Sequence, residues 1–503
     1  MAAIIVKLVN DLSNNSVEIR ETLSQIKTAV YSLQIKELRD VVKTLPLTNI
    51  FLKLHVSDRE ELKLLKEILN RLLECLEPEV IHSQFRDEIE SGLNHQDEEI
   101  MILCLSQIKR YSNCHDAVNN LTTDIRLLQA VIRCLGNGTL AAAMISSDIL
   151  STVGKSTVAT EVLFSGALLE EFKENMAKND IVRYRVYEVV TNISISNPEA
   201  LNNTNVSGIL QTLMSEVTKD DILVQMNSIE MIGSLATSKH GLDYLEKHGI
   251  VCKMEEMLEA SESNPLVHFL MPALIKFFGS LACHDPKEVC EKHRGFLKST
   301  FDLLGTDDAV LRGVVVDTIG IIASTVEGKL ALNKQGEYMK DSMKHLCNMI
   351  THPPTEVKKR ALICLVNIFN INIEDQTDDV LSMLENWFSL ICFTPVDLIL
   401  TICQQPFQEL RCPALAIINS IANQNWGQLL LNAQPGFNEY LLNRSTENDK
   451  SGKDAKYKII ETLVDSPTTS THFGAPYLIK LKKFKNEGPF YVQTETEVAV
   501  ERE

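Results

Sequence analysis

The chain has 503 residues, of which 45% are hydrophobic and 23% charged, as is ordinary for a folded protein. Its formal net charge of -18 repels phosphate backbones, which argues against a nucleic-acid partner unless a local basic patch overrides it. The length is too great for one compact core, so the core must be extended or split. Many Leu, Ile, Val and Ala with few Pro predict helices joined by short connections.

The cysteines and the apolar runs bear on the compartment of the protein. The chain has 12 Cys, none in a CxxC pair, and most lie within apolar runs, which is typical of reduced thiols in the cytosol or nucleus. The N-terminus lacks the apolar core of a signal peptide, and Asp317 interrupts the run Val314–Ala323. We therefore predict a soluble, cytoplasmic and nuclear protein that does not contact membranes.

Residues 1–90 show the apolar periodicity of helices, and we interpret them as N-terminal helical repeats. Helices are expected over Val17–Tyr31, Ile35–Thr44 and Ser57–Leu76. Pro46 and Pro78 mark the connections.

From about residue 95 the apolar pattern repeats, which predicts HEAT/armadillo-like repeats over 91–443. The copies align on an anchor, the first apolar residue of a helix; the anchors are Ile100, Ala141, Val182, Val224, Val267, Leu311, Val357 and Leu410. Apolar residues recur at i+8 in every copy and small or apolar ones at i+4 in most, with Ser228 fitting less well. A unit of two or three helices cannot bury its own apolar face. The fold class predicted is therefore all-α, a curved α-solenoid.

The helix predicted over Asp180–Ile195 is the clearest copy, with Asp180 expected to accept free amide hydrogens at its start. A basic residue follows the anchor in four copies, as Arg183, Arg312, Lys358 and Arg411. Nearby acids precede these anchors, so a ladder of ion pairs between repeats is one interpretation. The other is partner binding, because Arg and Tyr are frequent interface anchors; for this the candidates are Arg183, Tyr187 and Arg312.

The C-terminal part begins with a polar break, 444–454, followed by a last helix over Ala455–Leu463. We interpret 444–490 as a helical cap and 491–503 as a disordered acidic tail. The cluster Lys480–Lys485 is either a solvated helix face or a contact for an acidic partner.

Candidate chemical motifs fail on spacing. Gly154-Lys155-Ser156-Thr157 ends like a phosphate-binding loop, but the second glycine that such a loop needs is replaced by Ile149. Cys283, His284, Cys290 and His293 match no closed zinc motif, and Cys283 is expected in the core. The sequence lacks HExxH and a GxSxG ahead of a helix. We therefore predict no enzyme, no cofactor and no metal.

Several stretches resemble a family of HEAT/armadillo-repeat chaperones that assemble the base of the 26S proteasome regulatory particle. They run in the expected order from the middle of the chain almost to its end: Asn179–Glu188, Val316–Gly320, Val326–Lys329, Gln376–Ser389, Ile421–Leu430, Asp449–Tyr457 and Glu487–Val492. The resemblance implies a protein without enzymatic activity. It implies binding to the C-terminal region of one proteasomal ATPase subunit, in an intermediate that also holds the largest non-ATPase base subunit. It further implies release before the complete particle forms.

Two hypotheses for binding follow. In the first, the concave face of a monomeric solenoid clasps a folded ATPase domain and blocks early docking of the ATPase tail. In the second, the chain is a generic armadillo-type adaptor that holds an extended peptide through Asn and Trp ladders. Asn192 and Asn367 lie where such asparagines would, but only Trp387 and Trp426 are available and neither repeats.

Overall fold

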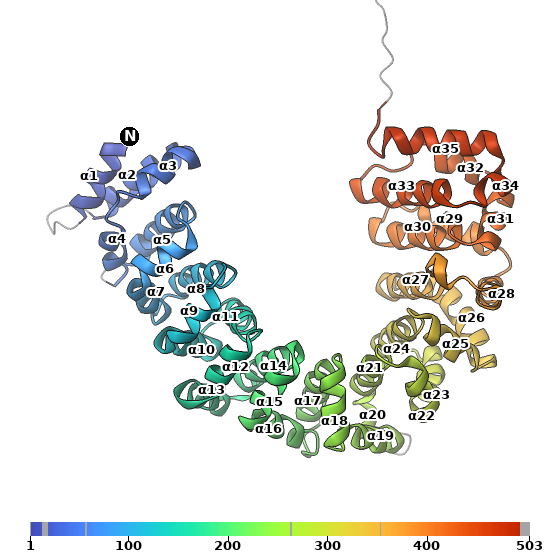
Figure 1. Cartoon of the computed structure of the whole chain (residues 1–503), viewed down its shortest axis with the longest axis horizontal. Helices are drawn as coiled ribbons and strands as arrows, with labels where there is room; N and C mark the ends of the chain where they lie inside the picture. Colours follow the sequence, from blue (N-terminus) through green and yellow to red (C-terminus); the bar gives the residue numbers. More distant parts are fainter. Residues whose placement is uncertain (1, 13–18, 56–57, 262–263, 353, 493–503) are drawn as a thin grey trace, which may run out of the picture. The chain divides into compact units, whose positions relative to one another are not determined.

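The computed structural model describes residues 2–12, 19–55, 58–261, 264–352 and 354–492 (Figure 1). All of its regular elements in this part of the chain are helical, so the predicted all-α fold is confirmed. The chain divides into two compact units, Met1–Tyr244 and Leu245–Glu503, which are described separately below.

Unit 1 consists of the first helices of the chain. They are α1 (Ala2–Asp11), α2 (Ile19–Ser32), α3 (Ile35–Val42), α4 (Leu47–Lys53), α5 (Arg59–Leu73), α6 (Pro78–Gln84), α7 (Arg86–Leu93), α8 (Glu98–Ser112), α9 (Ala117–Thr123), α10 (Ile125–Asn137), α11 (Leu140–Val153), α12 (Thr157–Leu163), α13 (Gly166–Lys178), α14 (Asp180–Ser196), α15 (Pro198–Val206), α16 (Ile209–Glu216) and α17 (Ile222–Leu235). Helix α18 (Lys239–Lys247) spans the division between the units.

Unit 2 contains the remaining helices. They are α19 (Ile250–Ala260), α20 (Pro265–His268), α21 (Met271–Ala282), α22 (Pro286–Lys292), α23 (Arg294–Asp302), η1 (Leu303–Gly305), α24 (Ala309–Ile322), α25 (Val326–Asn333), α26 (Glu337–Thr351), α27 (Thr355–Phe369), η2 (Ile373–Asp375), α28 (Asp378–Ser389), α29 (Pro395–Cys403), α30 (Gln408–Ala422), α31 (Asn425–Ala433), α32 (Phe437–Leu442), α33 (Lys450–Asp465), α34 (Thr469–Phe473) and α35 (Ala475–Glu487).

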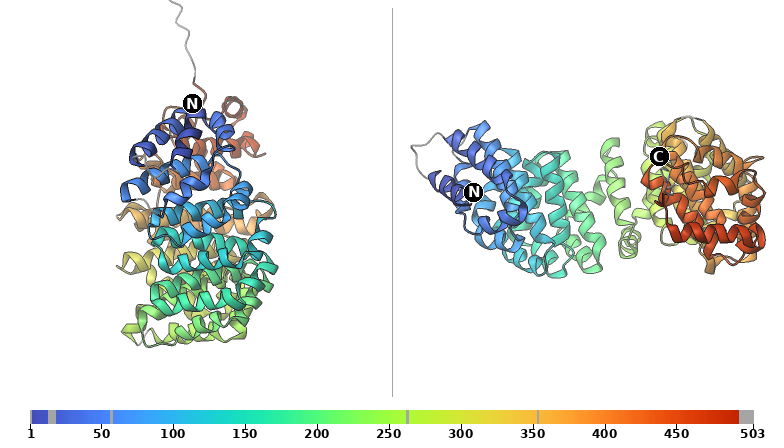
Figure 2. Two further views of the ribbon diagram at one scale, coloured as in Figure 1. Left: turned by 90° about the vertical axis from the view of Figure 1, so that its left-hand side faces the viewer. Right: turned by 90° about the horizontal axis from the view of Figure 1, so that it is seen from above.

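Equivalent helices of successive repeats stack on one another in rows. In unit 1 the longest row is α2, α5, α8, α11, α14 and α17, each packed on the next, while α9, α12 and α15 form a second row. In unit 2 the row α21, α24, α27, α30 and α33 lies on one side, and α28, α31 and α34 lie on the other (Figure 1). Figure 2 shows the stacked layers of each unit from two further directions. A repeat therefore contains three helices, and each unit is a stretch of α-solenoid.

The rows form because the predicted apolar positions are buried between neighbouring helices. We call the row members that carry the predicted anchors the anchored helices: α8, α11, α14, α17, α24, α27 and α30. All residues at i+8 are buried, at no more than 3% exposure: Ile108, Ile149, Val190, Ile232, Ile275, Ile319, Leu365 and Ile418. Burying such a side chain fully contributes roughly 1.5–3 kcal/mol. The apolar positions of the repeated sequence therefore determine how the helices of each row pack.

Two predicted anchors are wrong. Ala141 is exposed, and its neighbour Ala142 takes the buried position in α11. Val267 lies in the short α20, and the chain turns at Phe269–Leu270 before α21 begins at Met271. Pro272 explains the break, because proline has no amide hydrogen to donate to the carbonyl four residues earlier and its ring clashes with that carbonyl.

Three glycines allow close contact between two consecutive helices. In each case the glycine lies in the helix that follows an anchored helix, and it contacts the C-terminal end of that anchored helix. Gly241, Gly328 and Gly427 occupy equivalent places in α18, α25 and α31. A Cβ at any of them would overlap a backbone carbonyl oxygen six residues earlier, which for Gly328 is that of Ile322. Only glycine fits this contact without a shift of one helix.

The start of α14 differs from the prediction. Asn179, not Asp180, is the N-cap, and its side chain accepts a hydrogen bond of 2.9 Å from the amide of Val182. Asp180 is the first helical residue and pairs with Arg183 at 2.8 Å. Its carboxylate also lies where the helix dipole favours negative charge.

The C-terminal region also differs. The predicted polar break is shorter, because α33 begins at Lys450 with Asp449 as its cap, and α34 and α35 follow it. In α35, Leu481 and Phe484 are buried while Lys480 and Lys482 are exposed, as in a solvated helix face. The predicted disordered tail lies outside the described residues from residue 493 onward. The predicted boundaries at 90 and 443 stay predictions.

Ion pairs link residues about one repeat apart, as the ladder interpretation expected, but mostly through other side chains. Examples are Arg86–Asp124 and Arg360–Asp317, both 2.6 Å, and Arg133–Glu171, 3.0 Å. Arg360–Asp317 is an exposed pair, and such pairs contribute about 0–1 kcal/mol each. Asp124 and Glu171 are at most 15% exposed, so the other two pairs are partly buried.

No single helix in the described ranges is long and apolar enough to cross a membrane; α24 and α25 meet the criterion only as a pair bent by 115°.

Candidate functional site

Arg183 and Tyr187, two predicted partner-binding residues, lie in a buried polar cluster of unit 1. Both reach Glu216 at the end of α16, which is only 1% exposed. The guanidinium Nε of Arg183 lies 2.9 Å from the carboxylate of Glu216, and the hydroxyl of Tyr187 donates to it at 3.1 Å. The hydroxyl of Ser228 donates at 3.4 Å and the ammonium of Lys219 at 3.1 Å. The cluster thus joins α14, α16 and α17.

The burial of this cluster defines what its members can do. Tyr187 is fully buried, and burial together with Glu216 raises the pKa of its hydroxyl. Ser228, the residue that fitted the repeat less well, is buried because Glu216 accepts its hydrogen bond. Arg185 donates to the carbonyls of Leu135 and Gly138, beside the C-terminal end of α10. In this conformation these side chains hold repeats together, and their partner-binding role stays a prediction.

Arg411, at the same repeat position as Arg183, has an equivalent arrangement in unit 2. Its Nε lies 2.9 Å from the carboxylate of Glu447, and its Nη2 contacts Asp449. Glu447 is 3% exposed and also accepts from the hydroxyl of Tyr440 at 3.1 Å. A buried carboxylate just ahead of the next row helix therefore receives the guanidinium in both repeats.

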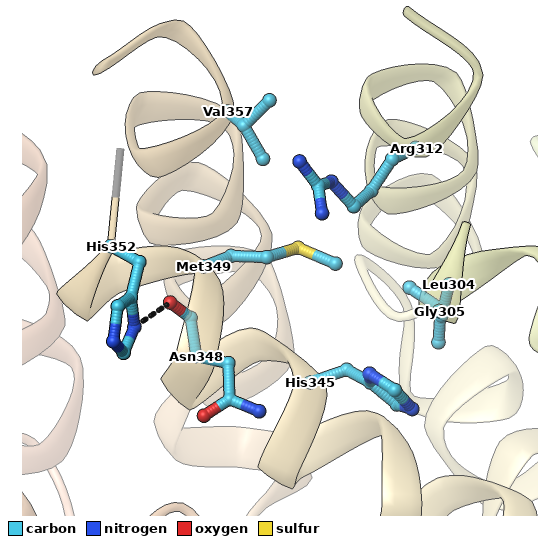
Figure 3. Close-up of a pocket in the computed structure, with 8 residues that line it drawn as sticks. All are labelled: Leu304, Gly305, Arg312, His345, Asn348, Met349, His352 and Val357. Atoms are coloured by element: carbon cyan, nitrogen blue, oxygen red, sulfur yellow. Dashed lines mark hydrogen bonds between the residues drawn. The ribbon is translucent and has the colours of Figure 1, made fainter. Parts of the chain in front are cut away.

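Arg312, the third predicted partner-binding residue, lies in a different setting. Its side chain points into a pocket of about 200 Å³ between η1, α24, α26 and α27 (Figure 3). The lining residues are Leu304, Gly305, Arg312, His345, Asn348, Met349, His352 and Val357. No acid among the described residues forms an ion pair with its guanidinium, whereas Arg183 and Arg411 each pair with a buried glutamate. The predicted residue is thus the one with its charge still available.

An exposed apolar row, which the sequence analysis missed, lies in unit 1. Leu140, Ile181 and Leu223 are 63–68% exposed, and each directly precedes the predicted anchor of α11, α14 or α17. The starts of α14 and α17 lie side by side, since the hydroxyl of Tyr184 in α14 donates to the carbonyl of Val224 in α17 at 3.3 Å, and α11 packs on α14. The signal was an apolar residue immediately before the anchor. Exposed apolar patches mark interaction sites.

The phosphate-loop-like sequence and the Cys/His cluster lie in helix ends, turns and the core. Gly154 ends α11 and Ser156 precedes α12, so the phosphate-loop-like sequence forms a turn within a repeat. Cys283 is exposed, contrary to the prediction, because α21 ends at Ala282; Cys290 is buried and His293 contacts Glu255. Within the described ranges, no group of three or more metal-ligating side chains occurs.

The residues of the adaptor hypothesis are only in part accessible. Trp387 and Trp426 are buried, and the indole of Trp426 donates to Gln424 at 2.8 Å inside unit 2. Asn192 is exposed and Asn367 half-buried. A tryptophan ladder open to a peptide is therefore not formed by these two side chains.

Comparison with known proteins identifies the family. The family model described as "Proteasome non-ATPase 26S subunit" matches residues 1–503. The chain belongs to this family. Similar proteins named 26S proteasome non-ATPase regulatory subunit 5 occur in Homo sapiens, 37% identical over 96% of both chains, and in Bos taurus, 37% identical over 100% of this chain and 99% of that one. The Drosophila melanogaster protein of that name is 25% identical over 89% of this chain and 87% of its own.

These findings confirm the family resemblance seen in the sequence. Among solved structures, that of an engineered protein aligns with 96% of this chain and 99% of its own at 14% identity, with a TM-score of 0.37. A likeness at that level carries no argument about this proteasome-subunit family member.

Proposed function

We propose that this member of the family is a non-enzymatic chaperone for assembly of the base of the 26S proteasome regulatory particle. The observation that carries the proposal is the match of the whole chain to the family, with a human relative that shares 37% of its residues over 96% of both chains. The stacked helices support it, because rows of repeats offer extended surfaces for protein partners.

The proposed partners are the C-terminal region of one proteasomal ATPase subunit and, in the same intermediate, the largest non-ATPase base subunit. The chain, a monomer in the cytoplasm and nucleus, would hold the ATPase domain and block early docking of its tail. Release would follow when the finished ring supplies a competing contact, for which a moderate affinity is enough.

We place the contact on the N-terminal ends of the anchored helices of unit 1. The apolar row Leu140, Ile181 and Leu223 supplies exposed apolar area there. Within unit 1, Arg183 and Tyr187 support this surface from beneath through Glu216. Arg312, in unit 2, is a separate candidate contact, for which its pocket is the supporting observation.

The test of the function is purification of the tagged full chain from cells, with sizing on native gels and identification of every bound chain. Recovery of a subset of proteasomal ATPases without the proteolytic core is expected. Recovery of whole proteasomes would instead make the chain a constitutive subunit. Recovery of neither would refute the proposal and favour the adaptor that binds extended peptides.

The test of the placement is the double variant Ile181→Asp and Leu223→Asp. Both residues are in the first turn of a helix, where a carboxylate is favourable, so the fold should be kept. ATPase binding should weaken by about tenfold or more, as expected when interface anchors are lost. Val158→Asp is the matched control, because Val158 is 64% exposed at the same place in α12 but belongs to another row. Equal binding by the double variant and the control would refute the placement.

A further inference from the structure

The repeats use one arginine position in two ways. Arg183 and Arg411 each direct a guanidinium to a buried carboxylate, Glu216 or Glu447, near the end of the third helix of the repeat. In the repeat of Arg312 the corresponding end of α26 carries His345, Asn348 and Met349, none of which is an acid. The receptor for a carboxylate is therefore retained in this repeat while the internal carboxylate is missing.

The pocket in front of Arg312 is large enough for a small chemical group, such as the end of one side chain. At about 200 Å³ it is smaller than the roughly 300–1,000 Å³ typical of pockets for drug-sized ligands. Leu304, Met349 and Val357 are buried and form its apolar walls, whereas Asn348 and His352 are exposed at its rim (Figure 3). A single side chain that enters from solvent fits this shape.

The electrostatics of the pocket favour one negative charge. Val357 lies in the first turn of α27, whose N-cap, Pro354, makes no capping hydrogen bond through its side chain. The first amides of α27 therefore add positive potential. Two acids at the starts of the flanking helices have other contacts: Asp308 caps α24, and Glu356 pairs with Arg360.

We propose that the Arg312 pocket binds the carboxylate of an aspartate or glutamate side chain of a polypeptide partner. The planar guanidinium matches a carboxylate in a forked hydrogen-bonding geometry. Arg312 is the one Arg or Lys among the lining residues, beside two histidines. This set matches a carboxylate better than a phosphate, which is usually bound by a cluster of arginines. The inference deepens the proposed function and rests on it for the partner being a protein.

Methyl NMR of the full chain tests the inference through Met349, whose side chain lines the pocket. The probe is N-acetyl-glutamic acid α-amide, which carries only a side-chain carboxylate, and the neutral control is N-acetyl-glutamine amide. The Met349 signal is assigned by its loss in Met349→Leu. It should shift on titration with the acid, with a Kd on the order of 1 mM for one small contact. The amide should give no shift.

Arg312→Met should abolish the response, and Arg20→Met, which alters an exposed arginine that is paired with Glu60 in the other unit, should keep it. Arg312→Gln serves as a second variant if the first does not fold. The inference is overturned if Met349 does not respond to the acid, if it responds equally to the amide, or if the response survives in either Arg312 variant. A shift with inorganic phosphate alone would overturn the assignment to a carboxylate. Because no proteasomal protein is present, this outcome is independent of the purification experiment.

Discussion

Replacing Glu216 by alanine removes the acceptor on which four donors of unit 1 converge. Tyr187 and Ser228 are fully buried, so their hydroxyl groups would lose a partner that water cannot replace. Arg183, with 18% of its side chain exposed, keeps Asp180, and Lys219 is half exposed. The loss therefore falls mainly on the two hydroxyls and on one side of the guanidinium.

The magnitude follows from these burials. Removing one member of a buried ion pair destabilises by roughly 3–5 kcal/mol, and each buried donor left without a partner costs about 1–3 kcal/mol. Because Arg183 retains Asp180 and some contact with water, we expect the lower end, about 3 kcal/mol. Glu216→Gln keeps the volume and one acceptor, and should cost less.

Native-state hydrogen exchange of the amides of α14, α16 and α17 measures this change locally, which avoids assuming that a two-unit chain unfolds in one step. The control is Glu188→Ala, since Glu188 is exposed on α14 and its change should stay within about 0.5 kcal/mol. If Glu216→Ala were as stable as this control, the cluster would not hold the repeats together and the reasoning would be wrong.

Three further predictions concern unit 2. Gly328→Ala should destabilise the protein by about 1–3 kcal/mol in urea unfolding, because the added Cβ meets a backbone carbonyl. Gly295→Ala is the control, because the space around Gly295 is open and this change should not destabilise the protein. Equal effects of the two changes would contradict this. Burial lowers the pKa of Lys329 to about 8, so between this value and the unfolded pKa of 10.5 the unfolded chain binds more protons and stability rises with pH. Relative to Lys329→Met, the wild type should therefore gain about 1.4 kcal/mol per pH unit above pH 8, and a pH-independent difference would refute this. A thiol reagent should label the exposed Cys252 quickly. Cys364 is buried, and burial raises the pKa of its thiol, so it should react only when the protein unfolds. Early labelling of Cys364 would contradict this and would show that its helix opens readily.

The repeat itself was predictable because burial follows a fixed spacing. Every i+8 position of the aligned copies is buried. The anchored helices lie at the positions in the chain that the apolar periodicity predicted. The errors are local. Ala141 and Ala142 are chemically equivalent, so spacing alone did not distinguish them. Near Pro272, the apolar residues on both sides of the helix start follow one pattern, so the pattern did not show that α21 begins only at Met271.

The partners of the charged residues were not predictable in the same way. Arg183, Arg312 and Arg411 follow their anchors identically, and only the three-dimensional contacts separate two paired guanidinium groups from one that faces a pocket. Glu216 lies in a different helix of its repeat, so no short-range pattern links it to Tyr187. Periodicity reports which face is buried, but not which polar groups meet there.

The stacking of row helices also has an evolutionary consequence. Within unit 2, α27 packs on α24 and α30, so a substitution in one three-helix module is transmitted directly to the adjoining modules only. Related lineages are then free to drift on the outer surface of one module while those further along stay unchanged. Duplication or deletion of a whole module would change the length of the surface without redesigning a core, since the new junction repeats an existing one.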